Sequence, residues 1–258
     1  MKKVFISLLA VAAMACMSCQ ATTQESALKG KKVLFVYGGW DGHQPKETME
    51  VLKPWLESQG AIVELRNNLD AYADKELMAT IDLVIQTWTM GSITGEQERG
   101  LTEAVRNGVG IAGWHGGLGD SFRNNTDYQF MIGGQWVAHP GGKVDYDVDI
   151  ADKKDPVMKG LKTFHMKSEQ YYMHVDPSVK VLATTTFSGE GDTPWIKGVV
   201  MPVVWKKYYG KGRVFYSSLC HDASDFEVPE ALEIMKRGIE WAALSKEQAV
   251  FSWPKSWK

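Results

Sequence analysis

The chain has 258 residues, of which 44% are hydrophobic and 23% are charged, the composition of one globular domain with a sizeable core. Its formal net charge of -2 provides no basic surface, so the charge balance gives no reason to expect nucleic acid as a partner.

The first residues predict export. Lys2 and Lys3 precede an apolar run over residues 4–15, which is the pattern of a secretory signal and is too short to span a membrane permanently. A small residue precedes Cys16 and another precedes Cys19, as in the cleavage box of a bacterial lipoprotein. We favour Cys19 as the lipidated residue because a polar tether then follows it. A signal that is cleaved without lipidation is the alternative.

These features divide the chain into a signal over residues 1–19, a tether over 20–30, a domain over 31–248 and a tail over 249–258. We expect an exported lipoprotein of the bacterial cell envelope, in the periplasm or at the outer membrane, that meets the membrane through its lipid anchor only. Cys220 is then the one unmodified thiol of the mature domain, so no intrachain disulfide is expected.

The first half of the domain alternates strands with helices. A helix with apolar residues at helical spacing is predicted to end at Gly60, and a capping box of Thr94 and Gln97 predicts a second helix that runs to about Asn107. This alternation is typical of a doubly wound, mostly parallel α/β sheet. Buried strands are predicted at 33–37, 61–65, 82–87 and 109–114.

The second half is richer in strands. Apolar residues alternate over 143–150, which predicts an amphipathic strand, and another strand is expected over 179–185. Strands at 199–205 and 213–219 flank a glycine-containing turn, so we expect a hairpin at the edge of the sheet. A helix from Pro229 to Leu244 closes the domain.

A glycine-flanked histidine follows the strand at 109–114. The segment Gly113-Trp114-His115-Gly116-Gly117 ends an apolar run, and helix-compatible sequence follows it, which predicts a strand, a sharp turn and a helix. Enzymes with a nucleophile elbow place serine or cysteine at such a turn. Histidine is a good base and a good metal ligand, so His115 replaces nucleophilic chemistry with acid-base or metal chemistry.

Three histidines follow predicted strands. His43 comes after the first strand, His115 lies at the elbow, and His221 follows the strand at 213–219. Ligands collect at the carboxyl ends of parallel strands, so we expect the three imidazoles to share one site. Neutral imidazoles from separate loops suit zinc, or another divalent transition metal, with an open catalytic position. Hydrogen-bonded loop histidines that bind no metal are the alternative.

Two further side chains are candidates for the same site. His139 lies in a loop bounded by glycine and proline that can fold over this edge of the sheet. Glu169 stands among aromatic residues and is either a general acid or base or a solvated strand residue. Asp222 and Asp225 are expected either to orient His221 or to cap the segment that follows it.

Two other chemistries are not expected. Cys220 adjoins His221, but adjacent residues of an extended strand point to opposite faces, which favours a buried, inert thiol. The glycine pairs at 38–39 and 116–117 match neither phosphate-binding motif, so no nucleotide cofactor is expected.

The chain contains ten tryptophans, and aromatic walls are common in sugar-binding clefts. Core packing is the alternative for each of them. The candidates for contact with a substrate are Trp40, Trp88, Trp114, Trp136 and Tyr172.

Five ordered motifs together resemble the ThuA-like family, which is associated with trehalose utilisation, and the resemblance spans about residues 31–244. It implies a flavodoxin-like, mostly parallel sheet with helices on both faces, as in class I glutamine amidotransferases. The motifs are Gly113-Trp114-His115-Gly116-Gly117, Gly133-Gly134-Gln135-Trp136-Val137-Ala138-His139-Pro140, Asp155-Pro156-Val157-Met158-Lys159-Gly160-Leu161, Ser168-Glu169-Gln170-Tyr171-Tyr172 and Gly210-Lys211-Gly212-Arg213-Val214-Phe215-Tyr216.

The resemblance also bears on chemistry. In the amidotransferases the elbow carries a catalytic cysteine and a histidine follows a late strand, and these places match His115 and His221. Because the elbow thiol is missing, glutaminase activity is not expected. Members of the family are associated with bacterial sugar catabolism, and some resemble metal-binding proteins through the histidines that match His43, His115 and His221. The family often has glycine where this chain has Cys220.

Two hypotheses follow. The first is an enzyme of carbohydrate catabolism that hydrolyses, eliminates from or isomerises a keto-sugar or a glycoside. His43, His115 and His221 would hold a metal or supply acid and base, and His139 and Glu169 would complete the site. The second is a non-catalytic carbohydrate-binding module on an amidotransferase-like fold. Both hypotheses take a small carbohydrate as the partner and leave a homo-oligomer open.

Overall fold

The computed structural model describes residues 25–248. The predicted signal, both candidate lipidation residues Cys16 and Cys19, residues 20–24 of the tether and the tail lie outside the described residues, so those assignments stay predictions. Within residues 25–248, none of the helices combines the length and the apolar character needed to cross a bilayer.

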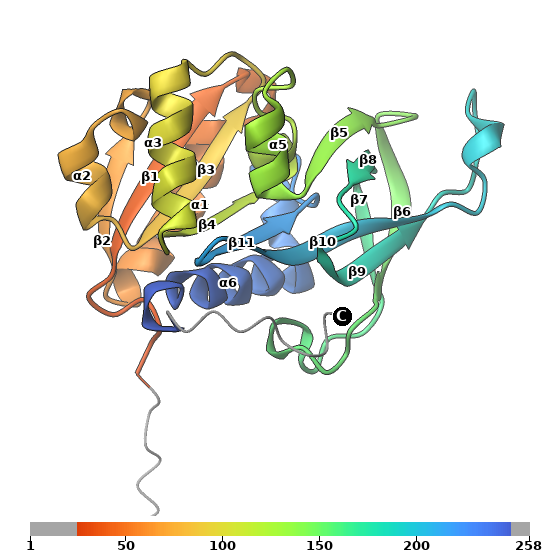
Figure 1. The fold of residues 1–258 in the computed structure, drawn as a ribbon. Coiled ribbons are helices and arrows are strands. Elements are labelled where there is room, and N and C mark those ends of the chain that lie inside the picture. Colours follow the sequence, from red (N-terminus) through yellow and green to blue (C-terminus); the bar gives the residue numbers. More distant parts are fainter. Residues whose placement is uncertain (1–24, 249–258) are drawn as a thin grey trace, which may run out of the picture.

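A mixed sheet organises the domain (Figure 1). Its nine strands have the order β2-β1-β3-β4-β11-β10-β9-β6-β7, and β5 and β8 form a separate two-stranded sheet. The strands are β1 (Lys32–Gly39), β2 (Ile62–Arg66), β3 (Leu83–Thr89), β4 (Gly110–Trp114), β5 (Gly134–Ala138), β6 (Lys143–Ile150), β7 (Phe164–Glu169), β8 (Tyr172–Val175), β9 (Lys180–Thr186), β10 (Val200–Tyr209) and β11 (Gly212–Ser217).

The sheet has a parallel part and an antiparallel part. Strands β2, β1, β3, β4 and β11 pair in parallel, whereas β10, β9, β6 and β7 pair antiparallel. The expected hairpin of β10 and β11 is present, but its predicted place at the edge of the sheet is wrong. Strand β11 pairs with β4 on its other side, and all six of its residues are buried, as is typical of a central strand.

Helices cover both faces of the sheet, which confirms the predicted flavodoxin-like α/β fold (Figure 1). The core on one face includes side chains of α1 and α6, and the core on the other includes side chains of α2, α3 and α5. The predicted capping box at the start of α3 is present. The helices are α1 (Pro45–Ser58), α2 (Lys75–Thr80), α3 (Gly95–Arg106), α4 (His115–Gly119), α5 (Thr126–Ile132) and α6 (Pro229–Ala243).

The register of the parallel strands brings their carboxyl ends to one edge. Gly39 of β1 lies beside Thr89 of β3, and Trp114 of β4 lies beside Ser217 of β11. The segments that leave β1, β4 and β11 therefore start close together. These segments carry His43, His115 and His221.

Candidate functional site

The elbow after β4 places His115 at the centre of the site. His115 has φ 47, a left-handed conformation that is uncommon outside glycine, and the hydroxyl of Tyr216 donates a hydrogen bond to its carbonyl at 3.0 Å. The next two residues must be small. A Cβ atom on Gly116 would lie 2.5 Å from the ring of His43, and one on Gly117 would lie 2.5 Å from Cα of Thr87.

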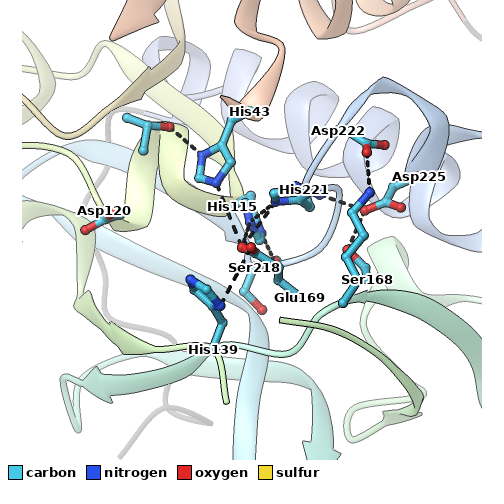
Figure 2. A network of polar contacts seen from close by, with 12 residues as sticks. His43, His115, Asp120, His139, Ser168, Glu169, Ser218, His221, Asp222 and Asp225 are labelled. Atoms are coloured by element: carbon cyan, nitrogen blue, oxygen red, sulfur yellow. Dashed lines mark hydrogen bonds and ion pairs between the residues drawn. The ribbon is translucent and has the colours of Figure 1, made fainter. Parts of the chain in front are cut away.

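Four side chains converge at this edge of the sheet (Figure 2). One candidate ligand atom from each lies within 4.8 Å of every other, so the four could hold a metal ion. The predicted convergence of the three histidines is thus observed. The fourth member is Glu169, the last residue of β7, from the antiparallel part of the sheet. The group, called the histidine–glutamate cluster below, consists of His43, His115, Glu169 and His221.

One carboxylate oxygen faces all three imidazoles. Oε2 of Glu169 lies 3.1 Å from Nε2 of His115, 3.2 Å from Nδ1 of His221 and 3.9 Å from Nε2 of His43. Nδ1 of His221 also lies 3.3 Å from Nε2 of His115. These distances place the four candidate ligand atoms around one point.

Hydrogen bonds behind the cluster orient two of the rings. Nδ1 of His115 lies 2.7 Å from the carbonyl oxygen of Ser218, which can only accept, so this nitrogen carries the proton. In the neutral ring Nε2 then has a free lone pair directed at Glu169. Nδ1 of His43 lies 2.8 Å from the hydroxyl of Thr89, which orients the second ring but, because a hydroxyl can donate or accept, does not determine its tautomer.

Burial favours the neutral form of two of the imidazoles. Desolvation lowers the pKa of His43 to about 3, with His115 and His221 adding to the shift, and desolvation likewise lowers the pKa of His115. Burial by itself would raise the pKa of Glu169, but the contacts with His115 and His221 outweigh it and hold that pKa well below its usual range. A neutral His115 ring that directs its lone pair at Glu169 cannot by itself lower that pKa, so the ionised carboxylate needs a proton or a cation on the side of the histidines.

This charge pattern fits a divalent metal. The lone pair of His115 Nε2 and the ionised oxygen of Glu169 are both acceptors, yet they face each other at 3.1 Å. A cation between them would satisfy both groups. Three imidazole nitrogens and one carboxylate oxygen are a donor set that zinc and similar transition metals accept.

Comparison with known proteins gives the family. The family model for ThuA, described as trehalose utilisation, matches residues 32–242. This chain belongs to the ThuA family. None of the curated proteins that were compared matches it.

Solved structures share the fold of this ThuA-family chain. A ThuA-like protein from Bacteroides uniformis ATCC 8492 is 15% identical with a TM-score of 0.71, and the match covers 88% of this chain and 97% of that one. A ThuA-like protein from Parabacteroides merdae ATCC 43184 is 22% identical with a TM-score of 0.67, covering 88% and 94%. A β-galactosidase from Bacillus circulans sp. alkalophilus matches at 13% identity and a TM-score of 0.50 over 83% of this chain but 32% of its own.

In this ThuA-family protein His139 approaches the second oxygen of Glu169. Its Nδ1 lies 3.7 Å from Oε1, beyond hydrogen-bond distance, and it is a buried atom that has no hydrogen-bond partner among the described residues. The imidazole packs beside Trp136 and Tyr171, with ring centroids 5.7 Å and 6.3 Å away. The loop that carries His139 thus lies over the cluster, as the sequence predicts (Figure 2).

One predicted substrate contact is wrong. Trp114 is only 2% exposed and packs edge-on against Phe35 and Phe226 in the core. Because successive residues of β4 point to opposite faces, its indole points away from the elbow side chain that follows it and has no surface for a ligand.

The other predicted aromatic contacts lie in different surroundings. Trp40 is 47% exposed and its ring centroid lies 4.7 Å from that of His43, so it flanks the cluster and faces solvent. The guanidinium of Arg123 covers the ring of Trp136 at 4.4 Å. Tyr172 is half-buried against Phe187. In half-buried Trp88 and in Trp136 the indole Nε1 is buried and has no hydrogen-bond partner within residues 25–248.

Sequence reasoning missed three contacts that shape the site. Tyr171 stacks on His115 with ring centroids 3.9 Å apart, and Thr89 and Ser218 orient two of the rings. Thr89 is the last residue of β3 and Ser218 directly follows β11, at the same sheet edge as the histidines, and this position was the signal available. The thiol of Cys220 is buried as predicted, and that burial raises its pKa well above the usual value.

Proposed function

We propose that this ThuA-family protein is an enzyme of carbohydrate catabolism that uses a divalent metal, zinc by preference, on a keto-sugar or glycoside. The observation that supports the proposal is the histidine–glutamate cluster, whose four candidate ligand atoms lie within 4.8 Å of one another. A metal bound there would polarise a keto oxygen or activate a water molecule. Hydrolysis, elimination and isomerisation all need one of these two steps.

The residues of the cluster and those around it would have different roles in the reaction. His43, His115 and His221 would hold the metal through neutral nitrogens, with Thr89 and Ser218 fixing two of the rings. The two oxygens of Glu169 differ, because Oε2 faces the three imidazoles and Oε1 faces Nδ1 of His139.

A proton can therefore be held at His139 Nδ1 or at Glu169 Oε1, on the side of the cluster away from the three rings. The 3.7 Å separation must shorten for direct transfer, as catalytic hydrogen bonds often do when a substrate binds. We assign general acid and base roles to His139 and Glu169.

Metal analysis and turnover test this proposal together. We expect about one zinc per purified wild-type chain, and none in the double variant His43→Ala/His221→Ala. We expect His115→Ala to reduce turnover of keto-glycosides by at least about 100-fold, within the usual contribution of an acid-base or metal-binding group. Metal-free wild-type protein, or unchanged turnover in His115→Ala for every keto-glycoside that the native protein converts, would contradict the enzyme.

A carbohydrate-binding module without catalysis is the second candidate. The exposed indole of Trp40 beside His43 favours it, because such a ring can stack on a sugar. Sugar binding that survives His43→Ala/His221→Ala but is lost in Trp40→Ala would support the module over the enzyme. Calorimetric titration with neutral disaccharides separates the two.

We further propose that the protein is anchored in the cell envelope through a lipid on Cys19. The support is the sequence pattern of residues 1–19. Mass spectrometry of the mature protein from a bacterial host should find a diacylglyceryl group on Cys19. A lipid on Cys16, or an unmodified amino terminus, would show that the assignment is wrong.

A further inference from the structure

A buried carboxylate joins two distant parts of the cluster. Asp225 lies in the short helix η5 (Ala223–Glu227) and is 6% exposed. Its Oδ2 atom accepts a hydrogen bond from the hydroxyl of Ser168 at 2.5 Å and another from the backbone N–H of His221 at 2.8 Å. Figure 2 shows Asp225 beside Ser168 and on the far side of His221 from His43.

Both donors are next to, or part of, cluster residues. Ser168 directly precedes Glu169 at the end of β7, and His221 follows β11. Strands β10, β9 and β6 separate β11 from β7 in the sheet, so the two segments are not neighbours through strand pairing. One oxygen atom of Asp225 therefore bridges the backbone of His221 and the residue beside Glu169.

Helix capping does not account for this arrangement. The N-cap of η5 is Asp222, whose side chain accepts from the N–H of Ser224. Asp225 lies inside η5, and its carboxylate accepts from β7 and from the loop after β11 instead. Burial of a carboxylate is unfavourable unless hydrogen bonds compensate for lost hydration, so the two bonds also determine where this group can lie.

We propose that Asp225 and Ser168 are positioning residues, which hold Oε2 of Glu169 and Nδ1 of His221 at the spacing that binds a divalent metal. That spacing is 3.2 Å. The inference rests on the proposed metal site. Removal of a group that orients a metal ligand commonly lowers metal affinity by about 10- to 100-fold. Here Asp225 holds the backbone N–H of His221 rather than its ring.

The test compares zinc affinity among folded variants. By competition with a chromophoric chelator, we expect Asp225→Ala to bind zinc about 10- to 100-fold more weakly than wild type. Ser168→Ala breaks one of the two hydrogen bonds to Asp225, so its zinc affinity should lie between those of wild type and Asp225→Ala. Asp225→Asn keeps an acceptor oxygen of similar size and should recover part of the loss. Visible spectra of the cobalt-substituted proteins should shift in the same order, because they report ligand geometry.

Asp155→Asn is the matched control. Asp155 is also a buried carboxylate, but it binds Lys206 Nζ at 2.6 Å and the backbone N–H of Val157, away from the cluster. We expect its zinc affinity to equal that of wild type even where its stability falls. The proposal would be overturned if Asp225→Asn and Ser168→Ala both had the zinc affinity and the cobalt spectrum of wild type. These two variants also provide the test if Asp225→Ala does not fold.

A metal-free measurement separates this proposal from the proposed function. If wild type binds no zinc, the metal enzyme is contradicted, and amide exchange by NMR then tests the positioning role. Asp225→Asn and Ser168→Ala should speed hydrogen exchange at the His221 amide and shift its ring signals, whereas the ring signals of exposed His174, outside the cluster, should stay unchanged. Unaltered His221 signals in both variants would refute the positioning role of Asp225 and Ser168.

Discussion

Nε2 of His115 lies 3.1 Å from Oε2 of Glu169, although 54 positions separate the two residues in the chain. His115 comes from the elbow after β4, and Glu169 ends β7 at the far edge of the sheet. The carbonyl of Ser218 holds the proton of His115 on the opposite nitrogen, so the contact joins a lone pair to an ionised oxygen. That pairing is unfavourable without a cation and is therefore the strongest structural argument for metal binding.

Thr89→Val should weaken metal binding. The hydroxyl of Thr89 bonds Nδ1 of His43 at 2.8 Å, and valine removes it with little change of shape. We expect a loss of about 10- to 100-fold in zinc affinity, because the ring is then free to rotate. Thr102→Val is the control, since the hydroxyl of buried Thr102 contacts only its own helix among the described residues. Equal zinc affinities in the two variants would show that Thr89 does not orient the ring.

The parallel part of the fold and the convergence of the histidines could be predicted from the sequence. Buried parallel strands are continuous apolar runs bounded by glycine, and their carboxyl ends share one edge, which brings His43, His115 and His221 together. The sequence makes Glu169 a candidate for the same site but leaves a solvated strand residue as the alternative. Its place beside the histidines depends on β7 pairing with β6, where Lys143 lies opposite Glu169, and on a strand order that local sequence does not encode.

The two errors have different physical origins. The position of the β10–β11 hairpin depends on β11 adding in parallel to β4, a long-range pairing that leaves no turn signal. Trp114 is a candidate for substrate contact because it lies near a predicted loop end, but strand alternation directs its side chain into the core. Proximity to a loop end was therefore a poor guide to the walls of the site.

The metal-free protein should lose stability in mild acid. Burial lowers the pKa of His43 to about 3, below its ordinary value of 6.5, so the unfolded chain takes up a proton first as the pH falls. The stabilisation is complete above about pH 6.5 and declines by about 1.4 kcal/mol per pH unit as the pH falls towards 3.

Urea unfolding at about pH 6.5 and about pH 4.5 measures this effect. The free energy of unfolding of wild type should fall by about 2 to 3 kcal/mol more than that of His43→Gln, which cannot titrate at that position. The depressed pKa of Glu169 acts in the same direction in both proteins and so cancels in the comparison. An equal decline in both proteins would contradict a neutral, buried His43.

Cys220 should be unreactive in the folded protein. Its side chain is fully buried, and burial raises the pKa of the thiol, so little thiolate forms at neutral pH. We expect iodoacetamide to leave the peptide that contains Cys220 unmodified in native protein and to alkylate it fully in urea, as mass spectrometry of the digest would show. Rapid alkylation of the native protein would reopen a nucleophilic role for this residue.

Gly116→Ala should damage the cluster through a single methyl group. The added Cβ would lie 2.5 Å from Cε1 and 2.7 Å from Nδ1 of His43, and the neighbouring ring of His115 restricts the space into which His43 could move. We expect a loss of about 1 to 3 kcal/mol in unfolding free energy, as for other overpacked sites, together with weaker zinc binding.

Gly95→Ala provides the comparison for this variant. Gly95 also lies in the first turn of a helix, but a Cβ there would meet only the mobile end of Arg99 at 3.2 Å. That variant should match wild type in zinc affinity and come within about 0.5 kcal/mol of it in stability. If both alanine variants bind zinc as wild type does, His43 can move without cost, and the close packing of the elbow against the first histidine is not required for the metal site.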